Sequence, residues 1–348
     1  MKEIIYFTKY TRKGASSRLR SYQYFPFLEE AGFSVRVYPL FSDSYLEQFN
    51  KGKVSKLTVL SMYSRRLWNL LKISRKSKII IEKELFPYLP AWGEQILSLL
   101  GMKYVVDYDD AIFHNYDLNS TRLIRFFLKN KIDIVMRNSY CVIAGNNYLK
   151  ERAEKAGAKR IEVIPTVIDL KRYEGYKKKN NEFVIGWIGS PSTFQYVEEI
   201  AHVLKELALN GAKIHIVGAK GDLGFTKNLH FITWTETSEV ENIFNFDVGI
   251  MPLKDSPWEK GKCSYKLIQY MACGLPVVAS PVGMNNEVVE QNRNGYLVNN
   301  LESWEDALSR YKDNPKLRKT HGECGYSSVI DSFTIKSQLK KLIGIINY

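Results

Sequence analysis

The 348-residue sequence has only four cysteines, Cys141, Cys263, Cys273 and Cys324, and their spacing fits neither a disulfide framework nor a zinc site. We therefore expect reduced thiols and a cytoplasmic protein. No uncharged apolar run approaches the roughly 20 residues that a membrane-spanning helix needs. The first residues, MKEIIYFTKY, lack the positive-then-apolar pattern of a signal peptide. These absences argue against a secreted or membrane-spanning protein.

Acidic residues are scarce in the first half of the chain. Residues 1–170 hold 28 Lys and Arg against 17 Asp and Glu, whereas residues 171–348 hold 22 against 20, and the net charge is +13. No acid occurs from Phe49 to Ile81, where nine cations interleave with Leu67, Trp68, Leu70, Leu71 and Ile73. These cations are Lys51, Lys53, Lys56, Arg65, Arg66, Lys72, Arg75, Lys76 and Lys78. Such a segment either lies on an anionic membrane surface or packs on the core with a solvated basic face. No recognised nucleic-acid-binding motif is present, so we expect no nucleic-acid partner.

Short apolar runs alternate with helical periodicity along both halves, which predicts an α/β protein with parallel, helix-covered sheets. The strand candidates are 4–7, 35–38, 78–81, 104–106 and 141–144, then 183–187, 214–217, 229–232, 248–251, 277–279 and 296–298. The helix candidates include 25–31, 67–73, 94–100, 122–135, 196–209, 239–244 and 334–346. The length suits two domains, whose ligands would bind at the carboxyl ends of the strands.

The richest segment is GKCSYKLIQYMACGLPVVASPVG, residues 261–283. It predicts a helix over Tyr265–Ala272 that ends at Cys273-Gly274, followed by a buried strand. Lys262, Lys266 and Gln269 fall on the face opposite the apolar one, near the helix start. Two ammonium groups beside backbone amides form a site for a multiply charged anion, most naturally a diphosphate.

A second turn, IGWIGSPST at 185–193, joins a predicted strand to a helix. Gly189 permits a tight turn, and Ser190 or Ser192 can cap the helix. Ser192 also forms a capping-box pattern with Gln195. The turn is either an ordinary capped helix start or a second phosphate contact, and its pairing with the Lys262 segment favours the second interpretation.

The 261–283 segment resembles the donor-binding segment of retaining GT-B glycosyltransferases, the "glycosyl transferases group 1" family. In that family the helix ends in a sequence like EAMACGLPVVAS and carries a glutamate that holds the donor ribose; here Gln269 takes its place. The family's other glutamate falls at Gly261, although Glu259 is close enough for a shifted loop to supply it. The cations that the family offers at the Gly189 turn are also missing.

This resemblance implies two Rossmann-like domains whose parallel sheets face each other across a cleft. Residues 1–165 would form the acceptor-side domain, with a C-terminal helix at 330–348 packing back on it. Residues 166–329 would bind the nucleotide sugar. It further implies retention of configuration without a metal ion, and it places Trp234 near the nucleotide base.

Polar loops after two strands of the first half complete the candidate site. The loop Thr11–Arg20 offers Gly14 for close backbone approach and Arg18 and Arg20 for anions, and by resemblance it faces the donor diphosphate and the acceptor; otherwise it is a solvated basic loop. Asp107, Asp109 and Asp110 follow another strand.

By resemblance, Asp109 occupies the place of a histidine that contacts the transferred sugar, with His114 as a nearby substitute. We assign Asp110 to the acceptor. The aspartates could instead cap a helix, or bind a metal as a D-x-D motif, which the two-domain pattern disfavours. Glu82, Lys83 and Glu84 could line an acceptor groove or form surface ion pairs, and we favour the interpretation as surface ion pairs.

We thus expect a hexosyl-type transferase that moves a sugar from a UDP- or GDP-linked donor to a hydroxyl acceptor, without a cofactor. The catalytic candidates are Asp109, Lys262 and Lys266. A lipid-linked saccharide at the inner membrane face, in bacterial surface polysaccharide synthesis, would suit the basic first half. The alternatives are a catalytically degenerate nucleotide- or glycan-binding protein and a sugar-nucleotide epimerase.

Overall fold

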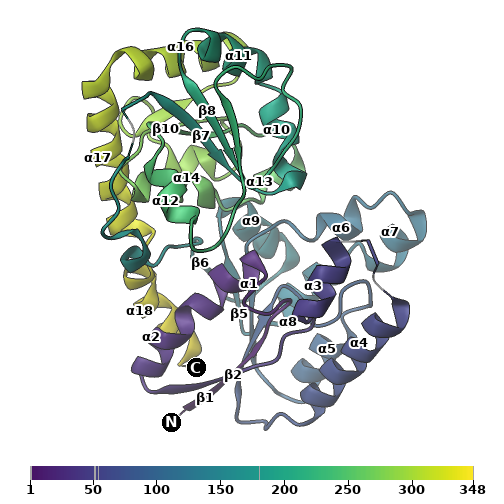
Figure 1. The fold of residues 1–348 in the computed structure, drawn as a ribbon. Coiled ribbons are helices and arrows are strands. Elements are labelled where there is room, and N and C mark those ends of the chain that lie inside the picture. Colours follow the sequence, from purple (N-terminus) through teal and green to yellow (C-terminus); the bar gives the residue numbers. More distant parts are fainter. Residues whose placement is uncertain (1, 51, 54, 180, 348) are drawn as a thin grey trace. The chain divides into compact units, whose positions relative to one another are not determined.

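The computed structural model describes residues 2–50, 52–53, 55–179 and 181–347, so Lys51 of the basic segment lies outside the described residues. The chain divides into two compact units (Figure 1). Unit 1 comprises Met1–Thr166, Gly261–Cys263 and Gln338–Tyr348, and unit 2 comprises Val167–Lys260 and Ser264–Ser337. The chain therefore passes from unit 1 to unit 2 after Thr166, contributes Gly261–Cys263 to unit 1, and returns to unit 1 at Gln338.

Unit 1 is built on a six-stranded sheet in the order β2-β1-β3-β4-β5-β6, in which every pair is parallel. The strands are β1 (Lys2–Phe7), β2 (Phe33–Val37), β3 (Lys78–Glu82), β4 (Tyr104–Tyr108), β5 (Cys141–Ala144) and β6 (Ile161–Val163). The central strands read as continuous apolar runs because helices cover both of their faces. The predicted strands of the first half are confirmed.

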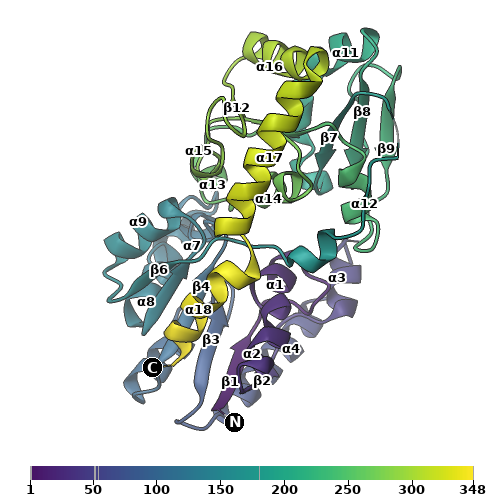
Figure 2. The same cartoon turned by 90° about the vertical axis from the view of Figure 1, so that its left-hand side faces the viewer.

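Alternating side chains of this sheet face two different helix layers. Ile5, Ile79 and Val142 join the apolar core under α4, α5, α8 and α9, whereas Tyr6 and Ile80 line a small cavity with Leu342 of α18. Figure 2 shows α18 lying across the unit 1 sheet. The helices are α1 (Ala15–Arg20), η1 (Tyr22–Tyr24), α2 (Phe25–Glu30), α3 (Asp43–Asn50), α4 (Lys56–Leu71), α5 (Trp92–Leu99), α6 (His114–Asp117), α7 (Arg122–Leu128), α8 (Lys131–Asn138), α9 (Asn147–Ala156) and α18 (Ile335–Ile346).

Unit 2 repeats the architecture with the strand order β12-β11-β10-β7-β8-β9, again parallel throughout. Its strands are β7 (Val184–Ile188), β8 (Lys213–Val217), β9 (Leu229–Ile232), β10 (Val248–Met251), β11 (Val277–Ala279) and β12 (Gly295–Leu297), as the sequence predicted to within a residue or two. After β7 the chain forms β8 next to it on one side, and β10 later pairs with β7 on the other side. The carboxyl ends of β7 and β10 thus flank a topological switch point, where open α/β sheets bind ligands.

Helices cover both faces of the unit 2 sheet as well (Figure 1). They are η2 (Leu170–Tyr173), η3 (Pro191–Thr193), α10 (Gln195–Glu198), α11 (Ala201–Leu209), α12 (Glu239–Phe244), α13 (Pro257–Lys260), α14 (Tyr265–Ala272), α15 (Asn285–Val288), α16 (Leu301–Asp313) and α17 (Pro315–Ser332). The helix predicted over Tyr265–Ala272 is confirmed as α14.

Two helices that the sequence predicted as continuous are each broken. The segment 122–135 divides into α7 and α8, and the segment 196–209 divides into α10 and α11 near Ile200, whose backbone leaves the helical region. The first break lets α8 bury Ile132 and Val135 while α7 leaves Phe126 and Phe127 exposed. Apolar periodicity continued through both breaks, so tertiary packing and not local propensity sets these boundaries.

Candidate functional site

Lys266 of α14 reaches the turn that follows β7. Its Nζ lies 4.4 Å from the centroid of the Trp187 ring and 3.4 Å from Oγ1 of Thr193. A Cβ atom at Gly189 would come within 2.7 Å of this Nζ, so only glycine allows the ammonium group to approach the turn so closely. A cation is therefore held against backbone at the carboxyl end of β7, on the aromatic face of a buried tryptophan.

The turn itself presents hydroxyl groups. Oγ of Ser190 and Oγ of Ser192 lie 2.9 Å apart, and both residues are exposed. The predicted capping box is wrong: Gln195 donates from its amide to the Ser192 carbonyl, and no side chain caps η3. The chain here forms a 3-10 turn before α10 begins, which leaves the hydroxyls facing solvent.

Ser264, which precedes α14, has a left-handed backbone with φ of 48°. Its buried hydroxyl donates to Oδ1 of Asn285 over 2.7 Å, and the Asn285 amide donates to the Ser280 carbonyl over 2.9 Å. The Ser264 side chain therefore anchors α14 to the loop after β11 and does not cap the helix. This anchoring fixes the direction in which Lys266 projects.

The sequence analysis placed Gln269 on the helix face opposite the apolar one, and this placement is wrong. Gln269 is buried, and its amide donates to Oε1 of Glu239 over 2.9 Å. Trp234 donates from Nε1 to the other carboxylate oxygen of Glu239 over 2.7 Å, and Arg172 lies 3.7 Å from Oε1. A Cβ atom at Gly218, whose φ is 89°, would lie 2.4 Å from the Gly189 carbonyl oxygen and 3.2 Å from Cβ of Trp234, so both groups border this glycine. The Gly189 turn, Trp234 and the Glu239–Gln269 pair thus adjoin one another.

Sequence reasoning missed Glu239 and Arg172. Glu239 begins α12, where an acid is unremarkable because it suits the helix dipole. Arg172 falls in a basic stretch, where one more arginine does not stand out. Only the tertiary structure shows that a buried carboxylate lies beside the position where relatives carry a glutamate.

The two positions suggested for the second glutamate differ in their surroundings. Within unit 1, a Cβ atom at Gly261 would lie 2.4 Å from Cβ of Ala111, so a glutamate cannot be accommodated there without movement. Within unit 2, Glu259 is buried and accepts hydrogen bonds from the hydroxyls of Tyr196 and Ser256.

The polar cluster of unit 1 centres on Asp109. Ser16 donates to Oδ2 of Asp109 over 2.6 Å, and Nζ of Lys83 lies 2.9 Å from Oδ1 of Asp109 and 3.6 Å from Asp110. Burial alone would raise the pKa of Asp109, but Lys83 and Arg20 outweigh it and the pKa is lowered. Burial and the charge of Asp109 raise the pKa of Asp110. Asp109 is therefore an ionised carboxylate with a fixed orientation.

The interpretation of Glu82, Lys83 and Glu84 as surface ion pairs is wrong, since all three are buried. Glu82 accepts from the Ser17 hydroxyl over 2.9 Å, and Glu84 pairs with the buried Lys131. Their partners come from distant parts of the chain, which local sequence cannot indicate.

The predicted loop 11–20 contains helix α1. Gly14 precedes this helix, and a Cβ atom there would lie 2.4 Å from Cβ of Tyr10. Arg18 and Arg20 are both buried. Arg20 pairs with Asp107 over 2.5 Å and donates to the Ile164 carbonyl over 2.9 Å, so its guanidinium group joins three elements of unit 1.

The segment 261–263 places Lys262 beside the aspartates of unit 1. Its carbonyl accepts from the Asn146 amide over 2.9 Å, and its charge lowers the pKa of Asp110 against the larger effects of burial and Asp109. Sγ of Cys263 lies 3.0 Å from the Asp109 carbonyl. The structure therefore groups Lys262 with Asp109 and Asp110, and it groups Lys266 with Gly189, Ser190 and Ser192. The ring nitrogens of His114 contact other residues, Oδ1 of Asp117 over 2.8 Å and the Tyr148 hydroxyl over 2.9 Å.

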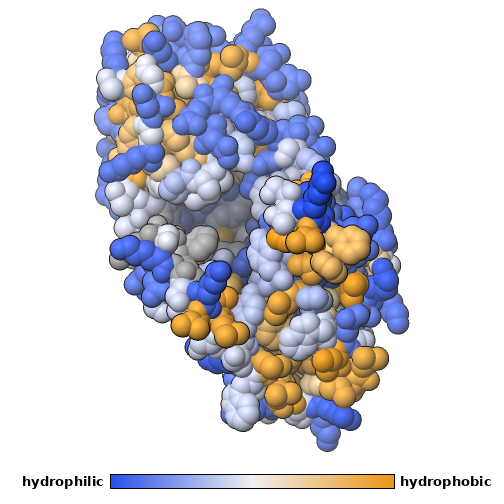
Figure 3. All heavy atoms as spheres, turned by 90° about the vertical axis from the view of Figure 1, so that its right-hand side faces the viewer, coloured by the Kyte–Doolittle hydropathy of each residue, from blue (hydrophilic) through white to orange (hydrophobic). Residues whose placement is uncertain are grey.

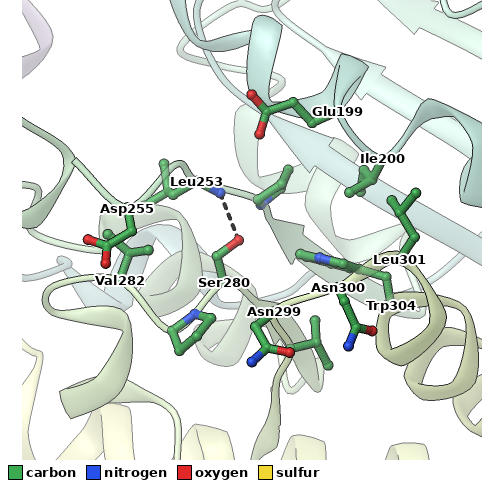
Figure 4. Close-up of a pocket in the computed structure, with 13 residues that line it drawn as sticks. Glu199, Ile200, Leu253, Asp255, Ser280, Val282, Asn299, Asn300, Leu301 and Trp304 are labelled. Atoms are coloured by element: carbon green, nitrogen blue, oxygen red, sulfur yellow. Dashed lines mark hydrogen bonds between the residues drawn. The ribbon is translucent and has the colours of Figure 1, made fainter.

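A cavity of about 380 Å³ lies at the carboxyl ends of β10, β11 and β12 (Figure 4). Ser280 accepts from the Leu253 amide over 2.9 Å within it. Its carboxylates, Glu199 and Asp255, pair with Lys254 and Lys260. No residue that the sequence analysis assigned to the site lines this cavity.

The described residues offer neither a helix that could span a membrane nor a cluster of metal ligands. None of the described helices combines the length and the apolar character that crossing a membrane requires. No group of three or more His, Cys, Asp or Glu in the described ranges is arranged to hold a metal ion.

Comparison with known proteins supports the resemblance seen in the sequence. Residues 182–314 match the family model "Glycosyl transferases group 1". The chain is 23% identical over 212 residues to the UDP-Gal:alpha-D-GlcNAc-diphosphoundecaprenol alpha-1,3-galactosyltransferase of Escherichia coli, covering 53% of each chain. It is 21% identical over 166 residues to the putative teichuronic acid biosynthesis glycosyltransferase TuaH of Bacillus subtilis, covering 42% of this chain and 41% of TuaH. The matches thus span about half or less of these curated relatives.

Solved structures match over nearly the whole chain. Sucrose-phosphate synthase of Thermosynechococcus elongatus superposes with a TM-score of 0.74 at 14% identity, covering 99% of this chain and 98% of that one. Anabaena Alr3699/HepE in complex with UDP-glucose gives 0.72 at 14% identity, covering 99% of each chain. The chain therefore has the GT-B fold, and its residues 182–314 belong to the glycosyl transferases group 1 family.

Proposed function

We propose that this protein is a glycosyltransferase that moves a sugar from a nucleoside diphosphate sugar to a hydroxyl acceptor. The observation that carries the proposal is the ammonium group of Lys266, held against the Gly189 turn at the switch point of the unit 2 sheet. A preorganised cation there would stabilise the charge that develops on a leaving diphosphate. The exposed hydroxyls of Ser190 and Ser192 would donate to the same phosphates.

The nucleotide would lie along the groups adjoining this turn. Trp234 would contact the base, and Gln269 the ribose. Gln269 is neutral, so we propose that the Glu239 carboxylate beside it accepts the ribose hydroxyls. A carboxylate has about four acceptor positions, and the contacts from Gln269 and Trp234 do not exhaust them.

We propose that the unit 1 cluster recognises the transferred sugar and the acceptor. Asp109 is ionised and held by Lys83 and Ser16, so it can accept hydrogen bonds from sugar hydroxyls in a fixed geometry. Asp110 and Lys262 lie at the edge of the same cluster. Gly14, Arg18 and Arg20 belong to the segment that positions it, and Arg20 acts through Asp107.

The family resemblance supports retention of configuration, transfer of a hexose and independence of metal ions and other cofactors, which we include in the proposal. The name of the Escherichia coli relative specifies a diphosphoundecaprenol acceptor, and the name of TuaH specifies teichuronic acid biosynthesis. We therefore propose a lipid-linked saccharide acceptor in bacterial surface polysaccharide synthesis. Such a cytoplasmic enzyme would work on the inner face of an anionic membrane.

Thermal unfolding with UDP, GDP, ADP and their sugar conjugates tests the donor site. A nucleotide at about 100 times its dissociation constant should add roughly 2.7 kcal/mol of stability. Lys266→Ala should weaken that nucleotide by roughly 10- to 100-fold, because a charge-assisted contact is lost. The matched control is Lys205→Ala, which removes an exposed lysine of α11. Unchanged affinity in a folded Lys266→Ala protein would contradict the proposal.

A second candidate is a nucleotide- or glycan-binding protein without turnover. Gly261 and Gln269, which occupy both glutamate positions of the family, favour it. Nucleotide binding without transfer to any acceptor would support this candidate. Conversion of a nucleotide sugar in the absence of an acceptor would instead indicate an epimerase.

A further inference from the structure

Helix α4 exposes large apolar side chains to solvent and buries a charged one. Its inner side contains Met62, the buried Arg66 and Leu70, whereas its outer side exposes large apolar side chains. These are Leu57, Leu60, Leu67, Trp68 and Leu71, which fall on one outward stripe of the helix. The sequence left two interpretations open, a membrane-facing segment or a core-packed helix with a solvated basic face, and the second is wrong for Arg66, which is buried.

Helix α7 repeats this exposure on the same side of unit 1. Leu123, Phe126 and Phe127 are 68%, 75% and 70% exposed, although Leu128 anchors the helix in the core. The rings of Phe126 and Phe127 stand at 89° to each other with centroids 5.0 Å apart. Helix α5, which packs with α4 around Phe86, adds further exposed apolar residues, namely Ile96, Leu99 and Leu100. Figure 3 faces this side and shows the apolar patches set among hydrophilic residues.

The charges on these elements are of one sign. No acidic residue occurs between Gln48 and Ile81 or between Leu118 and Ile132, and the three acids between Ile81 and Asp107, namely Glu82, Glu84 and Glu94, are buried. Lys56, Lys72, Arg122 and Lys129 pair with no carboxylate among the described residues. The acids of neighbouring α3, Asp43 and Glu47, are engaged by Lys13.

We infer that the outer faces of α4, α5 and α7 form a docking surface that inserts into the headgroup region of an anionic lipid bilayer. The apolar side chains would enter the boundary between headgroups and acyl chains, and the cations would contact lipid phosphates. A second copy of this chain fits poorly, because its identical face would oppose cation to cation. This inference rests on the proposed function, because a lipid-linked acceptor would bring the protein to a membrane. The surface itself contains none of the residues proposed to bind the donor.

The charge pattern also distinguishes the two kinds of contact. Phe126 and Phe127 have no charged atoms, so their contribution should persist at high salt. The contribution of Arg122 and Lys129 should weaken as salt screens it. A surface that combines both should bind phosphatidylglycerol vesicles better than zwitterionic vesicles, with residual binding at high salt.

The test is co-flotation of the full chain with phosphatidylcholine vesicles that contain roughly one third phosphatidylglycerol. Phe126→Ser/Phe127→Ser should lower the partition coefficient at least about tenfold. Arg122→Gln/Lys129→Gln should lower it roughly fivefold for each cation removed, only at low salt. The matched control is Leu209→Ser/Leu301→Ser, which replaces two unit 2 leucines that are each 48% exposed.

The inference would be overturned if the wild type did not bind these vesicles. It would also be overturned if the Phe126→Ser/Phe127→Ser variant bound them as well as the wild type. Equal binding to pure phosphatidylcholine, or a wild-type dimer that the same variant dissociates, would also overturn it. The nucleotide-induced thermal shift is measured on every variant. It should be unchanged, so that a failure of the docking surface is separated from a failure of the proposed donor site.

Discussion

The contact between Gln269 and Glu239 makes one substitution especially informative. Gln269→Glu installs the carboxylate that relatives carry, yet one of its oxygens would lie where the amide nitrogen now stands, 2.9 Å from Oε1 of Glu239. Both side chains are buried, with 3% and 6% exposure. Two carboxylates at this distance cannot both ionise, so the pair must hold a proton. We therefore expect the family's own residue to destabilise this protein.

The size of the loss follows from the contacts removed. A hydrogen bond to a charged group contributes about 1.5–3 kcal/mol, and retaining the shared proton at pH 7 costs further free energy, so we expect a loss of about 2–4 kcal/mol at pH 7. For a unit of this size each kcal/mol corresponds to a fall in melting temperature of roughly 2–4 °C. In the folded variant the shared proton raises one carboxyl pKa above its unfolded value of about 4.3. The folded state then binds more protons, so the loss grows as pH rises above about 4 and diminishes below it.

The assay is thermal unfolding followed by circular dichroism between pH 5 and pH 8. The variant Gln269→Glu/Glu239→Gln exchanges the two side chains, so that a carboxylate again contacts an amide. It should recover most of the lost stability. A double-mutant cycle isolates this coupling. If Gln269→Glu were as stable as the wild type at every pH, and the exchange brought no recovery, the two side chains would not be in contact and the proposed ribose site would lose its carboxylate.

Three further substitutions test other buried charges. Arg20→Met leaves Asp107 buried without its partner and should lower the free energy of unfolding by about 3–5 kcal/mol in urea titrations, with part of the loss regained in Arg20→Met/Asp107→Asn. Arg66→Met should be neutral or stabilising by up to about 4 kcal/mol, because Arg66 is buried over Phe7 without a carboxylate partner and burial lowers its pKa to about 9. Burial and His230 lower the pKa of His215 to about 4, so the unfolded state binds more protons between about pH 6.5 and 4 and stability falls as the pH drops through that range. His215→Leu should flatten this dependence in unfolding measurements at stepwise pH, and an unchanged slope would contradict the assignment.

The strands were predictable because the residues that form them, such as Ile79–Ile81 and Val277–Ala279, are apolar on both faces and bounded by turn residues. The candidate site was predictable where its chemistry is local, as at Gly189 and Lys266. It was not predictable where a contact joins distant positions. The Glu239–Gln269 bond spans 30 residues and the Glu84–Lys131 pair spans 47.

Burial of charge was the other property that local sequence did not reveal. Arg66 lies among leucines on α4 with the periodicity of a surface cation, and Lys83 stands between two glutamates like a surface pair. Each is buried because a neighbouring element supplies a carbonyl or a carboxylate. The amphipathic pattern of α4 was therefore visible, but its orientation depended on Phe7 and Thr8, which precede it by some fifty residues.

The return of α18 to unit 1 sets an order for folding during synthesis. Leu342, Ile345 and Ile346 of this helix are buried, and Leu342 lines the same cavity as Tyr6 and Ile80. These side chains leave the ribosome only after all of unit 2 has emerged. Unit 2 can complete its core before α18 emerges, whereas in the unit that is made first η1 and α2 cover Tyr6 on this face of the sheet and the part under α18 stays uncovered until that helix arrives. The nascent chain thus exposes an apolar strip of this sheet through most of its synthesis, a surface that chaperones at the ribosome can bind.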